Sequence, residues 1–200
     1  MYNYRKLSKE QQERVLADRK KRRRPWHSPP HQELEGETFY IITAACYEHR
    51  HIIGYSPERM SECETELLEV FQSVSTQVYA WCVLPNHYHV LVCTAQLKEL
   101  LRQLGKFHGR SSFRWNGEEQ KRGRHCWCNA YDRIIRSVGH LYASLNYIHH
   151  NAVHHGYISK WQDWPWSSVH EFLAQYGREE TLRLWRTYPL LDYGKKWDIY

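Results

Sequence analysis

The spacing of apolar residues divides the chain into alternating strand and helix segments. Four segments alternate apolar with polar residues or form short runs rich in Val, Ile and aromatic residues, which predicts strands at residues 39–46, 78–85, 87–94 and 124–135. Three segments repeat their apolar residues every three or four positions, which predicts helices at 63–74, 96–114 and 140–153. This order predicts an α+β fold, a ferredoxin-like βαββαβ antiparallel sheet with one added helix and a C-terminal helix.

The flanking segments have a different composition. A polar helical stretch ends at PWHSPPH, residues 25–31, whose three prolines stop regular structure. Near the other end, Ser168 and Glu171 fit a capping box that opens the C-terminal helix. We therefore divide the chain into a basic N-terminal extension (1–38), one domain (39–176) and a C-terminal tail (177–200).

Composition indicates a globular protein outside the membrane. Hydrophobic residues make up 42% of the chain, yet no run of about 18 apolar residues exists to span a bilayer. The N-terminus lacks the apolar core of a secretory signal. Six cysteines without a CxxC pair indicate reduced thiols, and hence a cytoplasmic protein.

The net charge of +6 is unevenly distributed. Residues 1–24 hold ten Lys or Arg and three acids, and residues 98–136 hold ten and four, so the remainder is acidic. Two basic segments on an acidic body suggest a polyanionic partner. The KKRRR run at 20–24 is either a solvated arm or an arm that contacts DNA. In the second segment, Lys or Arg recurs every four residues, at Arg102, Lys106, Arg110 and Arg114. Like charges at this spacing repel on a helix, which favours a bound polyanion over a solvated face.

Two further polar patterns need a chemical explanation. In VLPNHYHVLV (83–92), His87 and His89 share one face of a strand, where two imidazoles either hold a metal or serve as buried structural histidines. Tyr147 and Asn151 are four residues apart and therefore share one face of a helix. The alternative is a core tyrosine beside an asparagine near a helix end.

Together, HYH after VLPN, then YIHHNAVHHG and DWPWSS, resemble the REP-associated tyrosine transposases of the single-tyrosine HUH superfamily, over residues 38–175. The resemblance implies that 39–176 is an HUH transposase-like catalytic domain with Tyr147 as its nucleophile. It implies that His87, His89 and Asn151 bind a divalent metal, Mg²⁺ or Mn²⁺. The implied reaction is metal-dependent cleavage and joining of single-stranded DNA through a 5′-phosphotyrosine intermediate.

The resemblance also implies the partners. The expected substrate is single-stranded DNA with hairpin-forming repeats, bound by a monomer or homodimer in the cytoplasm, at the nucleoid, without a membrane partner. Basic side chains that could follow the DNA backbone are Arg102, Lys106, Arg110, Arg114, Lys121, Arg122, Arg124 and Arg136.

Two other functions fit parts of the sequence. A zinc hydrolase would combine His125, Cys126 or Cys128 with the histidine pair, although the CWC spacing is not a known zinc pattern. A domesticated protein of the same fold would bind DNA without cutting it. The sequence hint for the second is Asn151-Ala152, where the family commonly has Asn-Pro.

Overall fold

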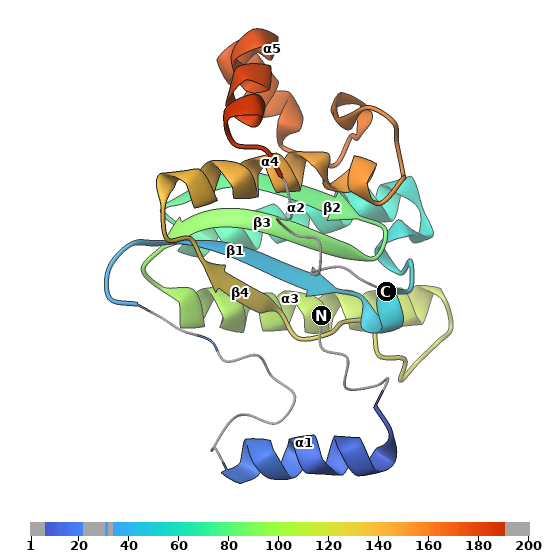
Figure 1. Cartoon of the computed structure of the whole chain (residues 1–200). Helices are drawn as coiled ribbons and strands as arrows, with labels where there is room; N and C mark the ends of the chain where they lie inside the picture. Colours follow the sequence, from blue (N-terminus) through green and yellow to red (C-terminus); the bar gives the residue numbers. More distant parts are fainter. Residues whose placement is uncertain (1–6, 22–30, 32–33, 191–200) are drawn as a thin grey trace.

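A computed structural model of the chain describes residues 7–21, 31 and 34–190. Its centre is an antiparallel sheet of four strands in the order β2-β3-β1-β4 (Figure 1). The strands are β1 (Thr38–Ala45), β2 (Gln77–Leu84), β3 (His87–Thr94) and β4 (Tyr131–Ile134). The connections β1-α2-β2 and β3-α3-β4 give the ferredoxin-like arrangement, so the predicted fold class is confirmed.

Helices cover both faces of the sheet (Figure 1). The α-helices are α1 (Lys9–Lys21), α2 (Pro57–Val74), α3 (Leu97–Glu118), α4 (Val138–His154) and α5 (Val169–Thr187), and the short 3-10 helices are η2 (Tyr47–His49), η3 (Ile53–Tyr55) and η4 (Trp161–Asp163). Successive side chains of β3 point to opposite faces. Tyr88 contacts Phe71 of α2 and His108 of α3, whereas the next residue, His89, contacts Tyr147 of α4. Every residue of β3 is buried because both faces are covered.

The fourth strand is shorter than predicted. Only Tyr131–Ile134 pairs continuously with β1, and the earlier half of the segment makes one isolated bridge, Cys46 with Trp127. That bridge is flanked by hydrogen bonds from Tyr47 N to Cys126 O (2.7 Å) and from Cys128 N to Ala45 O (2.8 Å). The alternating pattern therefore covers two short pairings separated by an unpaired step, which leaves space between this segment and α3.

The predicted capping box at Ser168 is wrong. The Ser168 side chain makes no cap for α5, because its Oγ accepts a hydrogen bond from Trp81 N (2.9 Å) and contacts His149 Nε2 (3.0 Å). It thus ties the start of α5 to β2 and α4. The helix is kinked at Gly177, with φ of 73°, and runs on to Thr187. The boundary drawn at 176/177 falls at this kink.

The turn between β2 and β3 is held by a close backbone approach. Gly54 N donates to Pro85 O (2.9 Å), and a Cβ at Gly54 would lie 2.4 Å from Pro85 Cβ. On the other side of the turn, Cys46 N donates to Asn86 O (2.7 Å). The backbone immediately before His87 is therefore fixed from two directions.

Candidate active site

The predicted metal ligands and nucleophile meet where α4 crosses β3. His87 Nε2 lies 3.1 Å from Asn151 Oδ1, and the rings of His87 and His89 lie 5.0 Å apart. The ring of Tyr147 lies 5.1 Å from that of His89. Strand alternation puts both histidines on the α4 side, and the four-residue spacing turns Tyr147 and Asn151 to the sheet. The structure thus brings all four residues together.

Two residues that the sequence did not single out orient the imidazoles. Asn86 Oδ1 lies 2.7 Å from His87 Nδ1, and Thr43 Oγ1 lies 2.6 Å from His89 Nδ1. Such bonds at one ring nitrogen fix the orientation of the ring, and thereby of the other nitrogen. Asn86 was adjacent to the motif in sequence, whereas Thr43 becomes visible only through the pairing of β1 with β3.

The donor set fits a divalent cation. A neutral imidazole carries one ring proton, and both nitrogens of His87 face amide oxygens, those of Asn86 and Asn151. If Nδ1 donates to Asn86, lone pairs of Nε2 and of Asn151 Oδ1 face each other, an arrangement that a cation stabilises. The opposite end of the Asn151 amide, Nδ2, has no hydrogen-bond partner among the described residues. Imidazole nitrogens with an amide oxygen suit Mn²⁺ well and Mg²⁺ acceptably.

The site is closed to solvent in this conformation. The relative exposure of His87, His89, Tyr147 and Asn151 is 1%, 0%, 2% and 0%. A further histidine, His155, one turn beyond Asn151, packs its ring 4.8 Å from that of His87. A ligand could therefore reach Tyr147 only if the elements around the site opened.

The residues of the zinc hydrolase hypothesis are not assembled. The His125 ring packs against Tyr47 (5.4 Å), and Cys128 Sγ lies 3.9 Å from Cys46 O. Within residues 7–21, 31 and 34–190, no three His, Cys, Asp or Glu side chains gather in a way that could hold a metal. This geometry gives the hydrolase hypothesis no support.

Of the eight predicted DNA-binding residues, four contact carboxylates of the protein and four make no such contact within the part of the chain that the structure describes. Three are engaged with carboxylates: Arg102 with Glu99, Arg114 with Glu66 (2.6 Å) and the nearly buried Arg124 with Glu119 (2.7 Å). Lys121 also contacts Glu119, at 3.1 Å, but its side chain is 59% exposed. The remaining four are exposed and make no ion pair among the described residues: Lys106, Arg110, Arg122 and Arg136.

The basic row on α3 and the candidate site around Tyr147 lie on different faces of the molecule. The row on α3 lies across the sheet from Tyr147, because α3 and α4 cover opposite faces (Figure 1). Of the KKRRR arm, residues 22–24 lie outside the described part of the chain. DNA that contacts both Tyr147 and α3 must therefore pass around an edge of the sheet.

Comparison with known proteins shows the family to which the chain belongs. The family model described as IS200-like transposase matches residues 37–151, from the residue before β1 to Asn151, and the chain belongs to this family. A protein of Haemophilus influenzae described as a REP-associated tyrosine transposase is 27% identical over 136 residues, covering 58% of this chain and 72% of that protein. The resemblance predicted from the motifs is therefore confirmed.

A solved structure has the same fold. The structure of a REP-associated tyrosine transposase bound to a REP hairpin superimposes with a TM-score of 0.55 at 17% identity, covering 74% of this chain and 86% of that one. In the part of our chain that the structure describes, no helix has both the length and the apolar character required to cross a membrane.

Proposed function

We propose that this chain cleaves and rejoins single-stranded DNA at hairpin-forming repeats, with Tyr147 as the nucleophile. The observation that carries the proposal is the convergence of Tyr147 and Asn151 with His87 and His89, with 3.1 Å between His87 Nε2 and Asn151 Oδ1. Membership of the IS200-like transposase family supports it. So does the hairpin bound by the structural relative.

The reaction is a transesterification. Tyr147 Oη attacks the scissile phosphorus, one P–O bond forms to tyrosine, and the P–O bond to the 3′ oxygen breaks. The phenol proton is lost to solvent and the departing 3′ oxygen gains one, which leaves a 5′-phosphotyrosine and a 3′-hydroxyl. Because the bond count is unchanged, a second 3′-hydroxyl can reverse the step and join strands without ATP.

The ligand residues supply the remaining chemistry. His87, His89 and Asn151 would hold Mg²⁺ or Mn²⁺, which when bound polarises the scissile phosphate. Asn86 and Thr43 keep the imidazoles oriented toward that position. Burial of these side chains excludes water in the closed conformation, so the phosphotyrosine is protected from hydrolysis once the opened elements close over it again.

The test is a covalent adduct between the protein and a single-stranded oligonucleotide that contains a palindromic, hairpin-forming repeat. With Mn²⁺ or Mg²⁺, the wild type should give an adduct on a denaturing gel. Tyr147→Phe should remove the adduct while keeping DNA affinity, because only the hydroxyl is lost.

Tyr142→Phe is the matched control. Tyr142 lies on the same helix, but its ring stacks on Tyr188 at 4.9 Å. This variant should form the adduct at the wild-type level. An adduct mapped to any other tyrosine contradicts the assignment. DNA binding without any adduct would instead identify a non-cleaving DNA-binding protein.

A further inference from the structure

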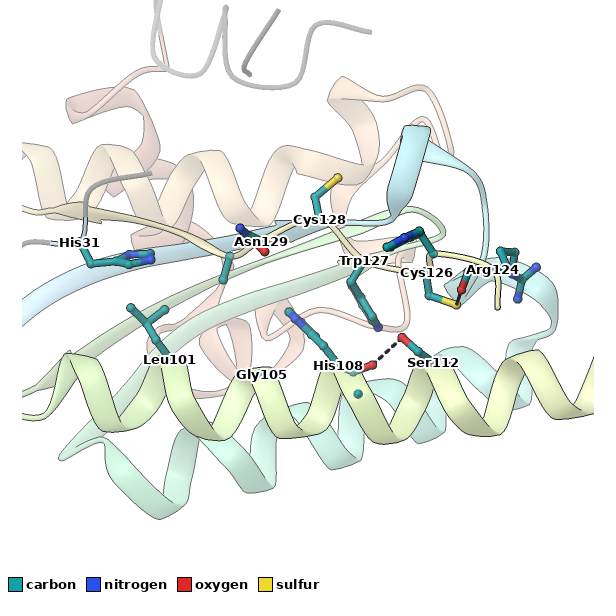
Figure 2. A pocket seen from close by; sticks show the side chains of 13 residues that line it. His31, Leu101, Gly105, His108, Ser112, Arg124, Cys126, Trp127, Cys128 and Asn129 are labelled. Atoms are coloured by element: carbon teal, nitrogen blue, oxygen red, sulfur yellow. Dashed lines mark hydrogen bonds between the residues drawn. The ribbon is translucent and has the colours of Figure 1, made fainter. Parts of the chain in front are cut away.

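A surface cavity of about 490 Å³ lies between α3 and residues 124–130 (Figure 2). It is on the side of the sheet that α3 covers, opposite Tyr147 of α4. We call it the α3 groove. It forms where the segment before β4 leaves β1 after the isolated bridge at Trp127. Its volume is within the range of sites that bind small organic ligands. The mechanism proposed for Tyr147 does not use it.

Two glycines make the wall of the α3 groove that belongs to the helix. Gly105 and Gly109 are one turn apart, both line the groove, and both lie inside α3. A Cβ at either position would meet nothing within 4 Å, so internal packing does not require glycine there. Neither has a positive φ. Since glycine destabilises a helix interior relative to alanine, two such residues beside a cavity indicate close approach of another molecule to the backbone.

An aromatic pair forms the inner wall. The His108 ring stacks on Trp127 at 4.3 Å with an interplanar angle of 17°. Both are held by hydrogen bonds, His108 Nε2 with Tyr88 Oη (3.0 Å) and Trp127 Nε1 to Ser111 Oγ (3.0 Å). Burial lowers the pKa of His108 to about 3, so the ring is neutral at physiological pH. Figure 2 shows His108 extending from α3 into the space beside Trp127. A fixed, neutral, planar surface is suited to stacking by a nucleobase.

The charge around the α3 groove favours an anionic ligand. No Asp or Glu is among the described residues that line it. Each glycine is followed by an exposed cation, Lys106 after Gly105 and Arg110 after Gly109. Neither cation lines the groove itself, because each lies about 100° further around the helix than the glycine before it, on the exposed side of α3. A base that enters over the glycines leaves its sugar-phosphate backbone at the surface of α3, the helix that carries these cations.

From this geometry we infer that the α3 groove binds one unpaired nucleotide of single-stranded DNA, apart from the cleavage site, with its base beside His108 and its phosphates at Lys106 and Arg110. The inference rests on the proposed function in taking DNA as the partner. It assigns to α3 a base-stacking role in addition to phosphate contact, and it gives a reason for the sequence GKFHGR at 105–110.

The experiment is an abasic scan read out by binding, in the full chain. The probe is a hairpin-forming oligonucleotide with unpaired flanks, whose nucleotides are replaced one at a time by abasic sites. For the wild type, one abasic position should weaken binding by about tenfold, the loss expected for one stacked base. Gly109→Gln extends a side chain into the groove. It should weaken binding of the intact probe by a similar factor and be insensitive to that abasic position.

Ala174→Gln is the matched control, because it adds the same side chain to an exposed position of α5. It should keep the wild-type response to the abasic site. The thermal midpoint of Gly109→Gln should equal or exceed that of the wild type, since glutamine is the better helix former. An abasic penalty that persists in Gly109→Gln, or no DNA binding by the wild type, overturns the inference. Adduct formation at Tyr147 is scored separately, so the groove and the cleavage site can fail independently.

Discussion

At the scale of single residues, the two site histidines take their orientation from different sources. His87 is held by its sequence neighbour Asn86, whereas His89 is held by Thr43, its partner in the register of β1 and β3. The bond between Thr43 Oγ1 and His89 Nδ1 turns the opposite nitrogen, Nε2, away from β1. Thr43 should therefore influence a bound metal without touching it.

We expect Thr43→Val to weaken Mn²⁺ binding by about 10- to 100-fold, because it removes the hydroxyl and keeps the branched shape. Isothermal titration of the protein with Mn²⁺, without DNA, measures the effect. Thr43→Ser restores the hydroxyl and should bind nearly as the wild type does, while the His87→Ala/His89→Ala double variant should not bind. Equal affinity in Thr43→Val and wild type would remove Thr43 from the site. Normal binding by the double variant would remove the metal hypothesis.

Residue spacing predicted which residues of the candidate site share a strand face or a helix face, but not the residues that orient them. His87 with His89, and Tyr147 with Asn151, follow from the periods of a strand and a helix. Thr43 could not be found, because the register that places it beside His89 joins positions 46 residues apart. The charge count likewise could not reveal that Arg124 is held by Glu119 and Asn116 inside the protein.

At the scale of elements, the basic residues of α3 differ in the direction they point and in whether they pair with a carboxylate. Arg114 points toward α2, where it meets Glu66, and Arg102 is paired with Glu99 one turn earlier. Lys106 and Arg110 lie between them on the exposed side. The four-residue period predicted a single row, but α2 packs beside α3 and pairs one end of the row, Arg114, with Glu66.

Because two of these residues are paired with carboxylates and, among the described residues, two are not, we expect the two pairs to contribute unequally to DNA binding. Lys106→Gln/Arg110→Gln should make the slope of log K against log[salt] shallower by about 1.4, the value for two phosphate contacts on a single strand. Arg102→Gln/Arg114→Gln removes the same charge and should change the slope less, because these side chains already neutralise carboxylates. Titrations at several salt concentrations measure both slopes. Equal slopes for the two double variants would show that only net charge matters.

The segment 124–135 shows why its strand was overpredicted. Apolar and polar residues alternate on both sides of the interruption in strand pairing, because Trp127 and then Tyr131–Ile134 pair with the chain at β1. Sequence periodicity reports which residues face inward, but not whether successive backbone groups find partners. The unpaired step at residues 129–130 is the part that opens the α3 groove.

At the scale of the whole molecule, the sheet separates two surfaces of different chemistry. Helices α4 and α3 lie on opposite sides of the sheet (Figure 1). The α4 side carries the buried histidines and Tyr147, and the α3 side carries the groove and the exposed cations. A strand that uses both would wrap around the sheet, which would separate DNA recognition from DNA cleavage. The α3 side must then be firmly attached to the rest of the fold.

That attachment is a buried ionic network between α2 and the end of α3. Arg59, whose side chain is 4% exposed, donates to Glu119 Oε1 (2.6 Å), to Glu118 Oε2 (2.8 Å) and to Ile52 O (3.1 Å). Glu119 is 5% exposed and is also held by Arg124. Hydrogen bonds from Arg124, and further ones from Arg59 and Lys121, lower the pKa of Glu119 to about 2 against the opposing effect of burial.

The network predicts a specific acid sensitivity. Since the pKa of Glu119 falls from 4.5 to about 2 on folding, its stabilisation is complete above pH 4.5 and is lost as the pH falls toward 2. The shift corresponds to about 3 kcal/mol at neutral pH. Glu119→Gln should therefore destabilise the protein at pH 7 by about 3 kcal/mol, since the buried Arg59 keeps only the half-exposed Glu118 as a charge partner. Between pH 5 and 3 the variant should lose less stability than the wild type.

Urea denaturation at a series of pH values measures this prediction. Glu180→Gln is the control, because Glu180 also pairs with an arginine, Arg183, but on the exposed side of α5. An exposed pair contributes little, so the stability of this variant should follow that of the wild type closely at every pH. If Glu119→Gln and the wild type lose stability in parallel as the pH falls, Glu119 is not the group that titrates. The attachment of α3 would then depend on apolar packing around Trp115 rather than on the ionic network.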